Sequence, residues 1–188
     1  MLKACLWRDD TLSHALESLW HRKANPVTAT HAVVSARTIL EVLPALVAAP
    51  DDPELRSRMA EASLSAGLAF SGTRTAIAHS ISYPVTLRHG VTHGIACSFT
   101  LPMILHSLAD ADGLHGRALR DIFGPDLRVG AGKLAAFLDG LGVGLAPADY
   151  GIDAAAWENI LAEATDGPRG RNFIGATTRL HPVAPRAA

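Results

Sequence analysis

Apolar residues recur at helical spacing from close to the start of this chain. An apolar stripe begins just after Asp10, and Asp9 or Asp10 can cap the helix that this stripe predicts. Asn25 and Pro26 are expected to end the helix, because an Asn-Pro pair favours a turn. The stripe consists of Leu12, Ala15, Leu16 and Leu19. Its spacing places all four side chains on one helix face, which is typical of a helix packed against a core.

The next apolar segments predict two more helices. One runs from about residue 27 to 47, and Pro44 is expected to kink or break it, because proline lacks a backbone N–H. The pair Asp52-Pro53 then marks a helix start, with an aspartate as cap and a proline in the first turn. That third helix is expected to reach about residue 70.

Pro84 sets the expected end of a fourth helix. This helix covers about residues 73–82 and should stop by Tyr83, because a proline disfavours helical dihedrals in the residue before it. Residues 84–92 are then expected to form a loop. Gly90 is available there for an unusual backbone conformation.

The second half of the chain predicts shorter helices. A fifth helix starts near His93, and Pro102 is expected to interrupt it. A loop rich in glycine and proline covers residues 140–151, and the tail from 166 to 188 shows no periodicity, so we expect it to be irregular or partly disordered. The remaining helices are expected near residues 114–123, 133–141 and 153–164.

The composition supports an all-α fold. The chain has 188 residues, which is typical of one domain, and 48% of them are hydrophobic whereas 19% are charged. Alanine and leucine are abundant, and no alternating strand pattern or internal repeat is present. The sequence therefore predicts a single helical, bundle-like domain.

The net charge, the aromatic content and the number of cysteines exclude several classes of partner and of structure. The formal net charge is -1 and aromatic residues make up 5%, so neither nucleic acid nor an anionic membrane surface is indicated. No run of about 18 uninterrupted apolar residues occurs, and the N-terminus lacks a signal-peptide pattern, so we expect a cytoplasmic protein without a membrane span. Cys5 and Cys97 are too few for a disulfide framework, and each is interpreted as a small buried residue.

Two groups of residues could bind a metal. Asp10 and His14 stand four residues apart, which puts both side chains on one helix face. His79 lies before the predicted loop and His93 lies after it, so a helix–loop–helix could bring their imidazoles together. One carboxylate and three imidazoles suit Fe(II) or Zn(II) and leave a position for a substrate oxygen. Taken alone, the Asp/His pair is equally compatible with a capping aspartate beside an unrelated histidine.

Five of the other histidines are predicted not to bind metal. His21 lies two helical turns from His14, at a basic helix end where a protonated imidazole would be favourable. His89 falls in the predicted loop and could line a substrate entrance. The five are His21, His31, His106, His115 and His181.

The segments that contain the candidate ligands resemble a known family. AHSISYPVTLRHGVTHGIACSFTLP resembles the metal-binding signature of the iron-containing (group III) alcohol dehydrogenases, and DTLSHALESLW resembles the Asp-x-x-x-His helix of that family. NPVTATHAVVSARTILEVLPALV and AEASLSAGLAFSGTRTAIAHS are similar to its intervening helices. The resemblance is close over residues 9–110 and looser to about residue 165. The SYPVT form is similar to the branch that includes phosphonoacetaldehyde reductases.

The resemblance implies a metal site and a role for one aromatic residue. It assigns the family's metal ligands to Asp10, His14, His79 and His93. Many members carry another histidine four residues after the third ligand, and this chain has Tyr83 at that position. Tyr83 is therefore the candidate catalytic residue, as a hydrogen-bond donor or proton relay, although a tyrosine pKa of about 10 makes it a poor base at neutral pH. Its hydroxyl is expected to face the metal pocket.

The chain departs from the family in one respect. Family members carry an N-terminal α/β domain whose glycine-rich turn binds the dinucleotide, and no such strand–turn–helix pattern is present here. The resemblance therefore implies the C-terminal helical half alone. We expect residues 1–8 to be a non-family start, 9–165 to be the metal-binding domain and 166–188 to be a tail.

The implied activity is hydride transfer between NAD(P) and a small alcohol or aldehyde whose oxygen is polarised by the metal. NAD(P) is expected only with the missing nucleotide domain. The expected partners of the chain are a separate nucleotide-binding domain or further copies of itself in a homo-oligomer. Two alternatives remain open: an inactive metal-binding fragment, or a free-standing metal hydrolase in which the same four residues activate water.

Overall fold

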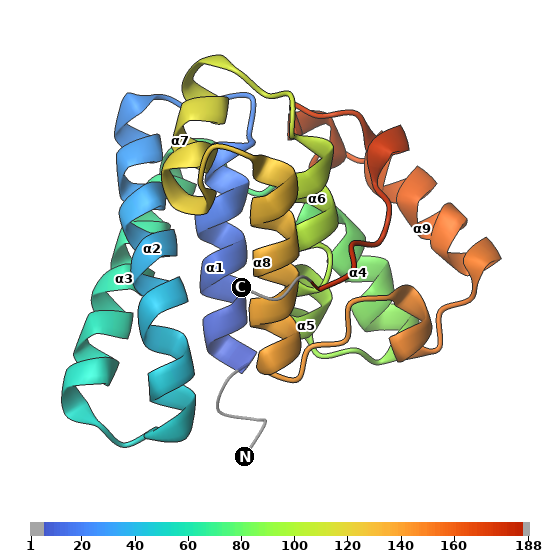
Figure 1. Cartoon of the computed structure of the whole chain (residues 1–188). Coiled ribbons are helices and arrows are strands. Elements are labelled where there is room, and N and C mark those ends of the chain that lie inside the picture. The colour runs from blue at the N-terminus through green and yellow to red at the C-terminus, as the bar shows by residue number, and fades with distance from the viewer. Residues whose placement is uncertain (1–5, 186–188) are drawn as a thin grey trace.

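Helix α1 (Leu6–Leu19) lies at the centre of the computed structural model, which describes the backbone of residues 6–185 and the side chains from residue 10 (Figure 1). The predicted apolar stripe is buried, and so are polar side chains on its other faces, among them Glu17. The cap predicted at Asp9 or Asp10 is wrong, because the helix begins at Leu6 and both acids lie inside it. Burial on several sides makes α1 the core helix, against which α2, α3, α4, α5 and α7 pack.

Helices α2 (Pro26–Ala48) and α3 (Pro53–Thr73) pack against each other and against α1. The predicted start at Asp52 is confirmed, since its side chain accepts a hydrogen bond from the Leu55 N–H. A kink or a break was expected at Pro44, and the break does not occur, because α2 continues through the proline. Leu43 and Leu46 beside the proline are fully buried, and their packing holds this turn in place despite the lost backbone hydrogen bond.

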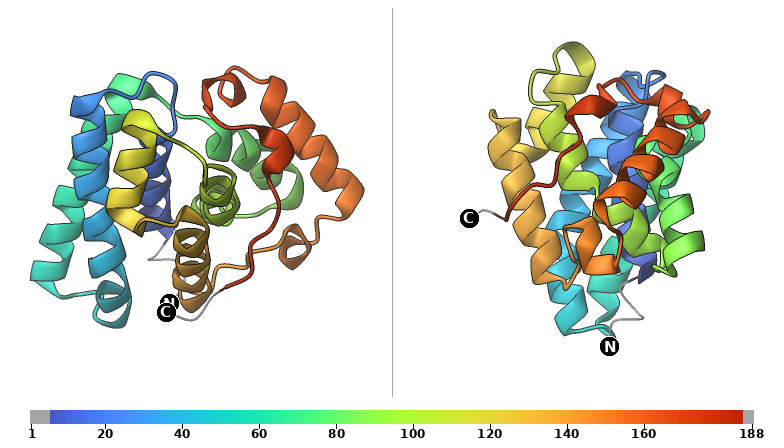
Figure 2. Two further views of the ribbon diagram at one scale, coloured as in Figure 1. Left: turned by 45° about the horizontal axis from the view of Figure 1, so that its top comes forward. Right: turned by 90° about the vertical axis from the view of Figure 1, so that its right-hand side faces the viewer.

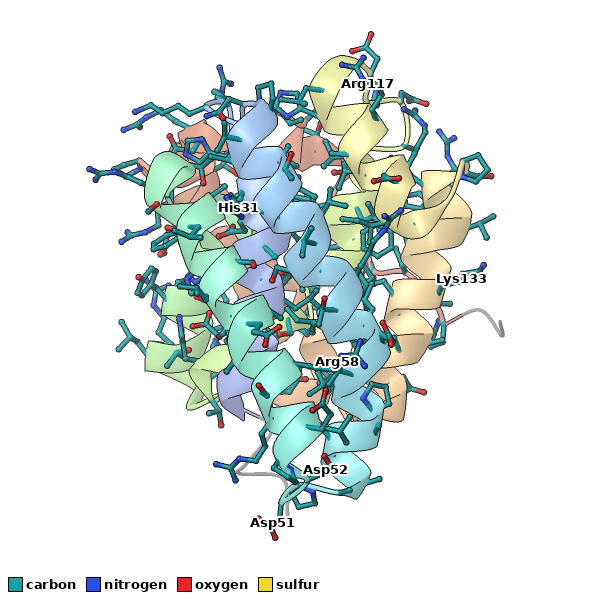
Figure 3. All side chains as sticks on the ribbon, turned by 90° about the vertical axis from the view of Figure 1, so that its left-hand side faces the viewer. His31, Asp51, Asp52, Arg58, Arg117 and Lys133 are labelled. Carbon is teal, nitrogen blue, oxygen red and sulfur yellow. The ribbon has the colours of Figure 1, made fainter. Side chains whose placement is uncertain are left out.

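The turn between α2 and α3 lies at one end of the molecule, where Figure 3 labels Asp51 and Asp52. Further along the two helices, Arg58 of α3 forms an ion pair of 2.8 Å with Glu41 of α2. The outer face of this helix pair therefore carries charged side chains, while its inner face contacts α1.

Helix α2 is long and apolar enough, by length and composition, to cross a membrane, with a mean hydropathy of 1.4 over the best window. A core helix of a bundle passes the same test. In this structure α2 packs against α1, α3 and α7, and its buried residues face them. The expectation that no segment is apolar enough to span a membrane rested on uninterrupted apolar runs alone, and α2 meets the broader criterion of length and mean hydropathy.

Helix α4 (Ile77–His89) contradicts the expected stop at Tyr83, because it continues for six residues beyond that tyrosine. Pro84 removes the hydrogen bond to the Ser80 carbonyl, but α4 packs along α9 there, and the Ser80 hydroxyl donates to the Ala164 carbonyl. The predicted loop 84–92 is therefore only the short connection after His89. Gly90 ends the helix with φ +68°, the left-handed conformation for which glycine was expected.

The interruption expected near Pro102 is present. Helix α5 (His93–Ser98) ends before it, and the proline lies in the first turn of α6 (Leu101–Ser107). Helices α7 (Gly113–Phe123) and α9 (Ala154–Asp166) match their predicted positions. Helix α8 (Leu127–Gly140) begins six residues before the predicted 133, because Asp126 caps it by accepting the Arg128 and Val129 N–H groups.

The tail is irregular, as expected, but it packs on the helices. It contains the single-turn segments Gly170–Asn172 and Thr177–Arg179. A similar short turn, Pro147–Tyr150, lies before α9 in the loop predicted for residues 140–151. Phe173 and Leu180 are buried, although no periodicity surrounds them. The tail crosses the end of the bundle beside α9 (Figure 2).

Residues 6–185 contain helices and turns without a strand, apart from one isolated bridge between His21 and Phe173. The predicted all-α fold is confirmed. Cys5 lies outside the described residues.

Candidate metal centre

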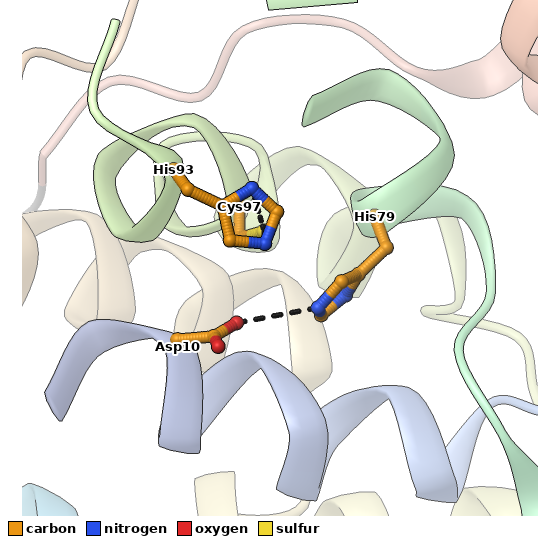
Figure 4. Close-up of side chains that lie close together, drawn as sticks. All are labelled: Asp10, His79, His93 and Cys97. Atoms are coloured by element: carbon orange, nitrogen blue, oxygen red, sulfur yellow. Dashed lines mark hydrogen bonds and ion pairs between the residues drawn. The ribbon is translucent and has the colours of Figure 1, made fainter. Parts of the chain in front are cut away.

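Side chains from three helices meet at one end of α1. Asp10 of α1, His79 of α4, and His93 and Cys97 of α5 each offer a ligand atom, and these atoms lie within 4.8 Å of one another (Figure 4). Asp10 Oδ1 and His79 Nε2 are 3.2 Å apart. The short connection after α4 turns the chain back, so α4 and α5 place their histidines on the same side of the carboxylate. We call these four residues the cluster.

His14, the other predicted ligand, lies beside the cluster. Its Nδ1 is 3.7 Å from Asp10 Oδ1, the oxygen that His79 also approaches. The ring centroids of His14 and His79 are 4.7 Å apart. The structure thus brings Asp10, His79 and His93 together and places His14 next to them.

Glu17 lies beneath the cluster and is completely buried. Its Oε2 accepts a 2.6 Å hydrogen bond from His79 Nδ1. Its Oε1 accepts the backbone N–H groups of Ala78 and His79, at 2.7 and 3.2 Å. Ala76, at the N-cap of α4, has no side-chain hydrogen bond to offer, so Glu17 of α1 takes over the role of a cap. One carboxylate therefore fixes both the start of α4 and the His79 ring, with Nε2 directed at Asp10.

Charges in the cluster are strongly coupled. Burial opposes the charged form of His79, but Asp10, Cys97 and Glu17 around it raise its pKa to about 12. Burial also opposes ionisation of Asp10, yet its contact with His79 and the nearby imidazoles lower its pKa. Burial lowers the pKa of His14. Without a metal, the cluster therefore holds a proton on His79 between two carboxylates.

Cys97 faces the imidazoles and was missed in the sequence. Its Sγ lies 3.6 Å from His93 Nε2. This contact raises the pKa of His93, whereas the pKa of the Cys97 thiol, despite burial, is lowered by His79 and His93. His93 and Cys97 are four residues apart on α5, as Asp10 and His14 are on α1, so the four-residue spacing could have identified Cys97 as a candidate ligand. For Glu17 the sequence offers less, namely an acidic residue next to Leu16, which is buried.

Tyr83 lies inside α4, one turn after His79, and not at a helix end. Its ring centroid is 6.0 Å from that of His93, and Arg169 stacks on it with its guanidinium carbon 4.8 Å from the ring centre. With 40% of its surface exposed, it lies at the rim of the site and outside the core.

None of the other histidines in the described residues belongs to the cluster. The charged state expected for His21 is wrong, because His21 is buried, burial lowers its pKa, and its Nδ1 accepts the Lys23 N–H. Helix α1 ends at Leu19, so His21 lies in the following turn and not in the last turn of the helix.

The residues present fit a divalent metal. Asp10 Oδ1 is buried and no donor meets it in hydrogen-bond geometry, although His79 Nε2 lies at ion-pair distance. A buried carboxylate oxygen without a full partner is costly, and a cation between it and the imidazoles would satisfy it. Carboxylate oxygen and imidazole nitrogen are ligands that both iron(II) and zinc(II) accept.

Known relatives match about half of the chain. Over 95 residues it is 39% identical to an NAD-dependent methanol dehydrogenase from Bacillus methanolicus, covering 50% of this chain and 25% of that protein. Over 101 residues it is 34% identical to a phosphonoacetaldehyde reductase from Streptomyces viridochromogenes, covering 51% of this chain and 24% of that protein. The chain thus spans about a quarter of the length of these relatives.

Solved structures match the whole helical domain. A sulfoacetaldehyde reductase from Bifidobacterium kashiwanohense, crystallised with NAD+, superposes with a TM-score of 0.83 at 28% identity, over 94% of this chain and 48% of that one. An iron-containing alcohol dehydrogenase from Thermotoga maritima, with a TM-score of 0.74 at 24% identity over 94% of this chain and 46% of that one, shows the same fold. The sequence model for the C-terminal region of the Fe-containing alcohol dehydrogenase family matches residues 9–178. The chain therefore belongs to the Fe-containing alcohol dehydrogenase family and corresponds to its C-terminal, helical region.

Proposed function

We propose that this chain is the metal-binding part of an alcohol dehydrogenase or aldehyde reductase. The observation that carries the proposal is the convergence of Asp10, His79 and His93 from three helices, with His14 on the same carboxylate oxygen. These four residues hold Fe(II) or Zn(II) in the proposal. When bound, the metal supplies a Lewis acid that polarises the oxygen of the alcohol or aldehyde.

Other residues of the chain prepare this site. Glu17 holds the His79 ring through Nδ1, so that Nε2 remains directed at the metal position. The buried helices α1, α4 and α5 exclude water from the protein side of the cluster, which strengthens electrostatic interactions there. In the proposal, Tyr83 donates a hydrogen bond to the substrate, which its position at the rim beside His93 supports.

Hydride transfer also needs a nicotinamide cofactor. An NAD-dependent enzyme and a structure with bound NAD+ are among the relatives. The described residues contain no strand and hence no strand-to-helix turn of the kind that usually binds a pyrophosphate. In the proposal, NAD(P) binds an α/β nucleotide domain outside this chain, and the helical domain forms the metal-bearing wall of the cleft.

Metal analysis of the purified 188-residue chain tests the proposal. We expect close to one divalent metal per chain in the wild type, and a loss of most of it in His79→Ala and His93→Ala. His31→Ala, an exchange on α2 outside the cluster, serves as the matched control and should keep its metal. Equal metal content in all four proteins would contradict the proposal.

Cobalt substitution tests the ligand set. With Asp10, His14, His79 and His93 as ligands, Co(II) should show no thiolate charge-transfer absorption, and His14→Ala should change its visible spectrum. A thiolate band that disappears in Cys97→Ser would show that Cys97 is a ligand, and an unchanged spectrum in His14→Ala would then show that Cys97 takes the place of His14.

A further inference from the structure

A polar cavity lies beside the metal cluster. It has a volume of about 610 Å³ and is lined by Phe70, Ser71, Arg74, Thr75, Arg169 and Asn172, together with Pro168. The end of α3, the connection from α3 to α4 and the segment before and within Gly170–Asn172 form its walls. Two arginines, two hydroxyls and an amide line it, and no carboxylate does.

Two residues that line this cavity connect it to side chains beside the cluster. The Phe70 ring centroid is 4.7 Å from that of His14. Arg169 stacks on Tyr83, whose ring neighbours His93. A larger hollow of about 840 Å³ lies between α2 and α7, and none of its lining residues forms a ring contact with the cluster, His14 or Tyr83. The smaller cavity is therefore the one next to the proposed chemistry.

The guanidinium of Arg169 is held in place through Nε, and its two Nη groups form no hydrogen bond within the described residues. Its Nε donates to Thr75 Oγ1 at 3.1 Å, and the Asn172 side chain fixes the same residue by donating to the Thr75 carbonyl at 3.1 Å. The stack on Tyr83 restrains its plane. Neither Arg169 nor Arg74 forms an ion pair with an acid of the described chain, whereas other arginines do, namely Arg37, Arg56, Arg58, Arg88, Arg128 and Arg179.

Arg74 adopts a backbone conformation that arginine rarely takes. Its φ is +82° and its ψ is -176°, and among the described residues it is the one non-glycine residue with positive φ. This region of backbone space is occupied almost only by glycine, and such strain concentrates at ligand-binding sites. A glycine would relieve the strain at this turn, so the presence of an arginine indicates a functional role for its side chain.

We propose that this cavity binds the anionic end of a small substrate, a phosphonate, sulfonate or carboxylate, through Arg74 and Arg169, while the alcohol or aldehyde end reaches the metal site. The proposal rests on the proposed function for that second end. Guanidinium groups bind tetrahedral oxyanions and carboxylates through paired N–H donors. The Ser71 hydroxyl and the Asn172 amide are the neutral polar groups that line the same cavity.

Calorimetric titration of the zinc-loaded 188-residue chain tests the proposal at fixed ionic strength. The probes are 2-hydroxyethylphosphonate, methylphosphonate and neutral 1-propanol. We expect 2-hydroxyethylphosphonate to bind at least about tenfold more tightly than 1-propanol, and Arg169→Gln and Arg74→Gly each to weaken it about tenfold. Arg74→Gly should at the same time raise Tm, because glycine fits the observed φ. The matched control is Arg88→Gln, an arginine of α4 paired with Glu163 outside the cavity, which should bind like the wild type.

Three results would overturn the proposal. The first is equal affinity of the chain for the neutral and the anionic probes, or unchanged phosphonate affinity in both arginine variants. If Arg169→Gln does not fold, Arg169→Lys takes its place. The second is equal affinity for the two phosphonates in the metal-loaded chain, which would separate the cavity from the metal site. The third is tighter binding of ADP than of 2-hydroxyethylphosphonate with the same arginine dependence, which would assign the cavity to nucleotide phosphates. Methylphosphonate binding by the metal-free chain tests the arginines even if the proposed metal function fails.

Discussion

At the scale of single residues, Glu17 connects folding to the metal site. It is completely buried, and all its hydrogen bonds go to the first turn of α4 and to His79. A buried carboxylate is stabilised only when donors surround it, and the same donors would be left unsatisfied without it. The side chain that holds α4 in place thus also sets which nitrogen of His79 is available.

Exchange of Glu17 should separate these two effects. Glu17→Ala leaves three buried donors without an acceptor, so we expect a loss of about 3–5 kcal/mol in the free energy of unfolding. Glu17→Gln keeps an acceptor for the backbone but turns an amide N–H toward His79 Nδ1, which moves the imidazole proton to Nε2. Its stability should fall by about 1.5–3 kcal/mol, and its metal affinity should fall about 10–100-fold.

Urea unfolding of the metal-free variants measures the stability change, and competition with a chromophoric chelator measures the affinity. Glu61→Gln, an exposed glutamate on α3, is the matched control and should change neither quantity. Metal affinity in Glu17→Gln within twofold of the wild type would contradict the proposed orientation of His79.

The raised pKa of His79 predicts how metal binding depends on pH. In the metal-free protein this pKa is about 12 against an ordinary 6.5. Its contribution to stability is therefore fully present below about pH 6.5 and is lost as the pH rises toward 12. The pH dependence of metal affinity has the opposite sign, because the metal must displace a proton from His79 Nε2. Affinity should rise about tenfold per pH unit between pH 6.5 and 8, with at least one proton released.

Calorimetry in buffers of different ionisation enthalpy counts the released protons, and chelator competition at several pH values gives the slope. An affinity that does not change over this range would show that His79 is not protonated in the metal-free chain.

At the scale of elements, local signals predicted most helices, and tertiary packing decided the exceptions. Asp52-Pro53 marked a helix start correctly, and Gly90 adopts the unusual backbone conformation expected of it, because capping and left-handed φ are properties of one or two residues. Pro84 was expected to end a helix and Pro44 to kink or break one, yet both helices continue through their prolines. Whether a helix survives a proline depends on what its neighbouring residues pack against, and a sequence pattern does not contain that information.

The tail illustrates the same limit. Its buried anchors, Phe173 and Leu180, are seven residues apart without periodic neighbours, so nothing in the sequence separates them from exposed apolar residues. Gly170 does have a detectable role once the structure is known. A Cβ atom at this position would clash with the carbonyl oxygens of Ala164 and Thr165 at the end of α9. The tail can approach α9 closely only because residue 170 is glycine.

Gly170→Ala should therefore destabilise the protein by about 1–3 kcal/mol, since both clashing atoms are backbone. It should also move Arg169 and Asn172 relative to Thr75. The matched control is Gly140→Ala at the end of α8, where a Cβ meets nothing within 4 Å, and it should raise stability by up to about 1 kcal/mol. Urea unfolding of both variants checks the pair, and a Gly170→Ala variant as stable as the control would refute the close approach.

The site was partly predictable for related reasons. Spacing alone pointed to Asp10 and His14, and the position of His79 and His93 around a loop suggested that they converge. Glu17 acts through contacts with residues of α4 that lie 61 and 62 positions later in the chain. Cys97 of α5 acts partly through His79, which belongs to another helix. The sequence could name residues of suitable chemistry, but it could not tell which buried polar groups would become partners.

At the scale of the whole molecule, the proposed function makes the helical bundle one side of an active site. The cluster lies at one end of α1, the polar cavity adjoins it, and Tyr83 is exposed at the rim. Large apolar side chains are also exposed, among them Leu64, at 66%, and Leu87, at 80%. Leu87 lies one turn beyond Tyr83 on α4, so the rim of the site continues into an apolar surface.

This arrangement predicts that the 188-residue chain does not turn over substrate by itself. Hydride transfer requires the nicotinamide ring to be held against the substrate carbon, and that position depends on binding the remainder of the dinucleotide. The described residues offer a metal site and a polar cavity, but no strand from which a pyrophosphate-binding turn could begin. The zinc- or iron-loaded chain should therefore show no detectable NADH or NADPH oxidation with acetaldehyde or propanal, and at most weak nicotinamide binding. Activity should appear only when a separate glycine-rich α/β domain is added, and it should then be lost in His79→Ala. Absorbance at the NADH band, followed with and without a chelator, measures both situations. Steady aldehyde-dependent NADH consumption by the pure chain, abolished by the chelator, would show that the helical domain is a complete enzyme.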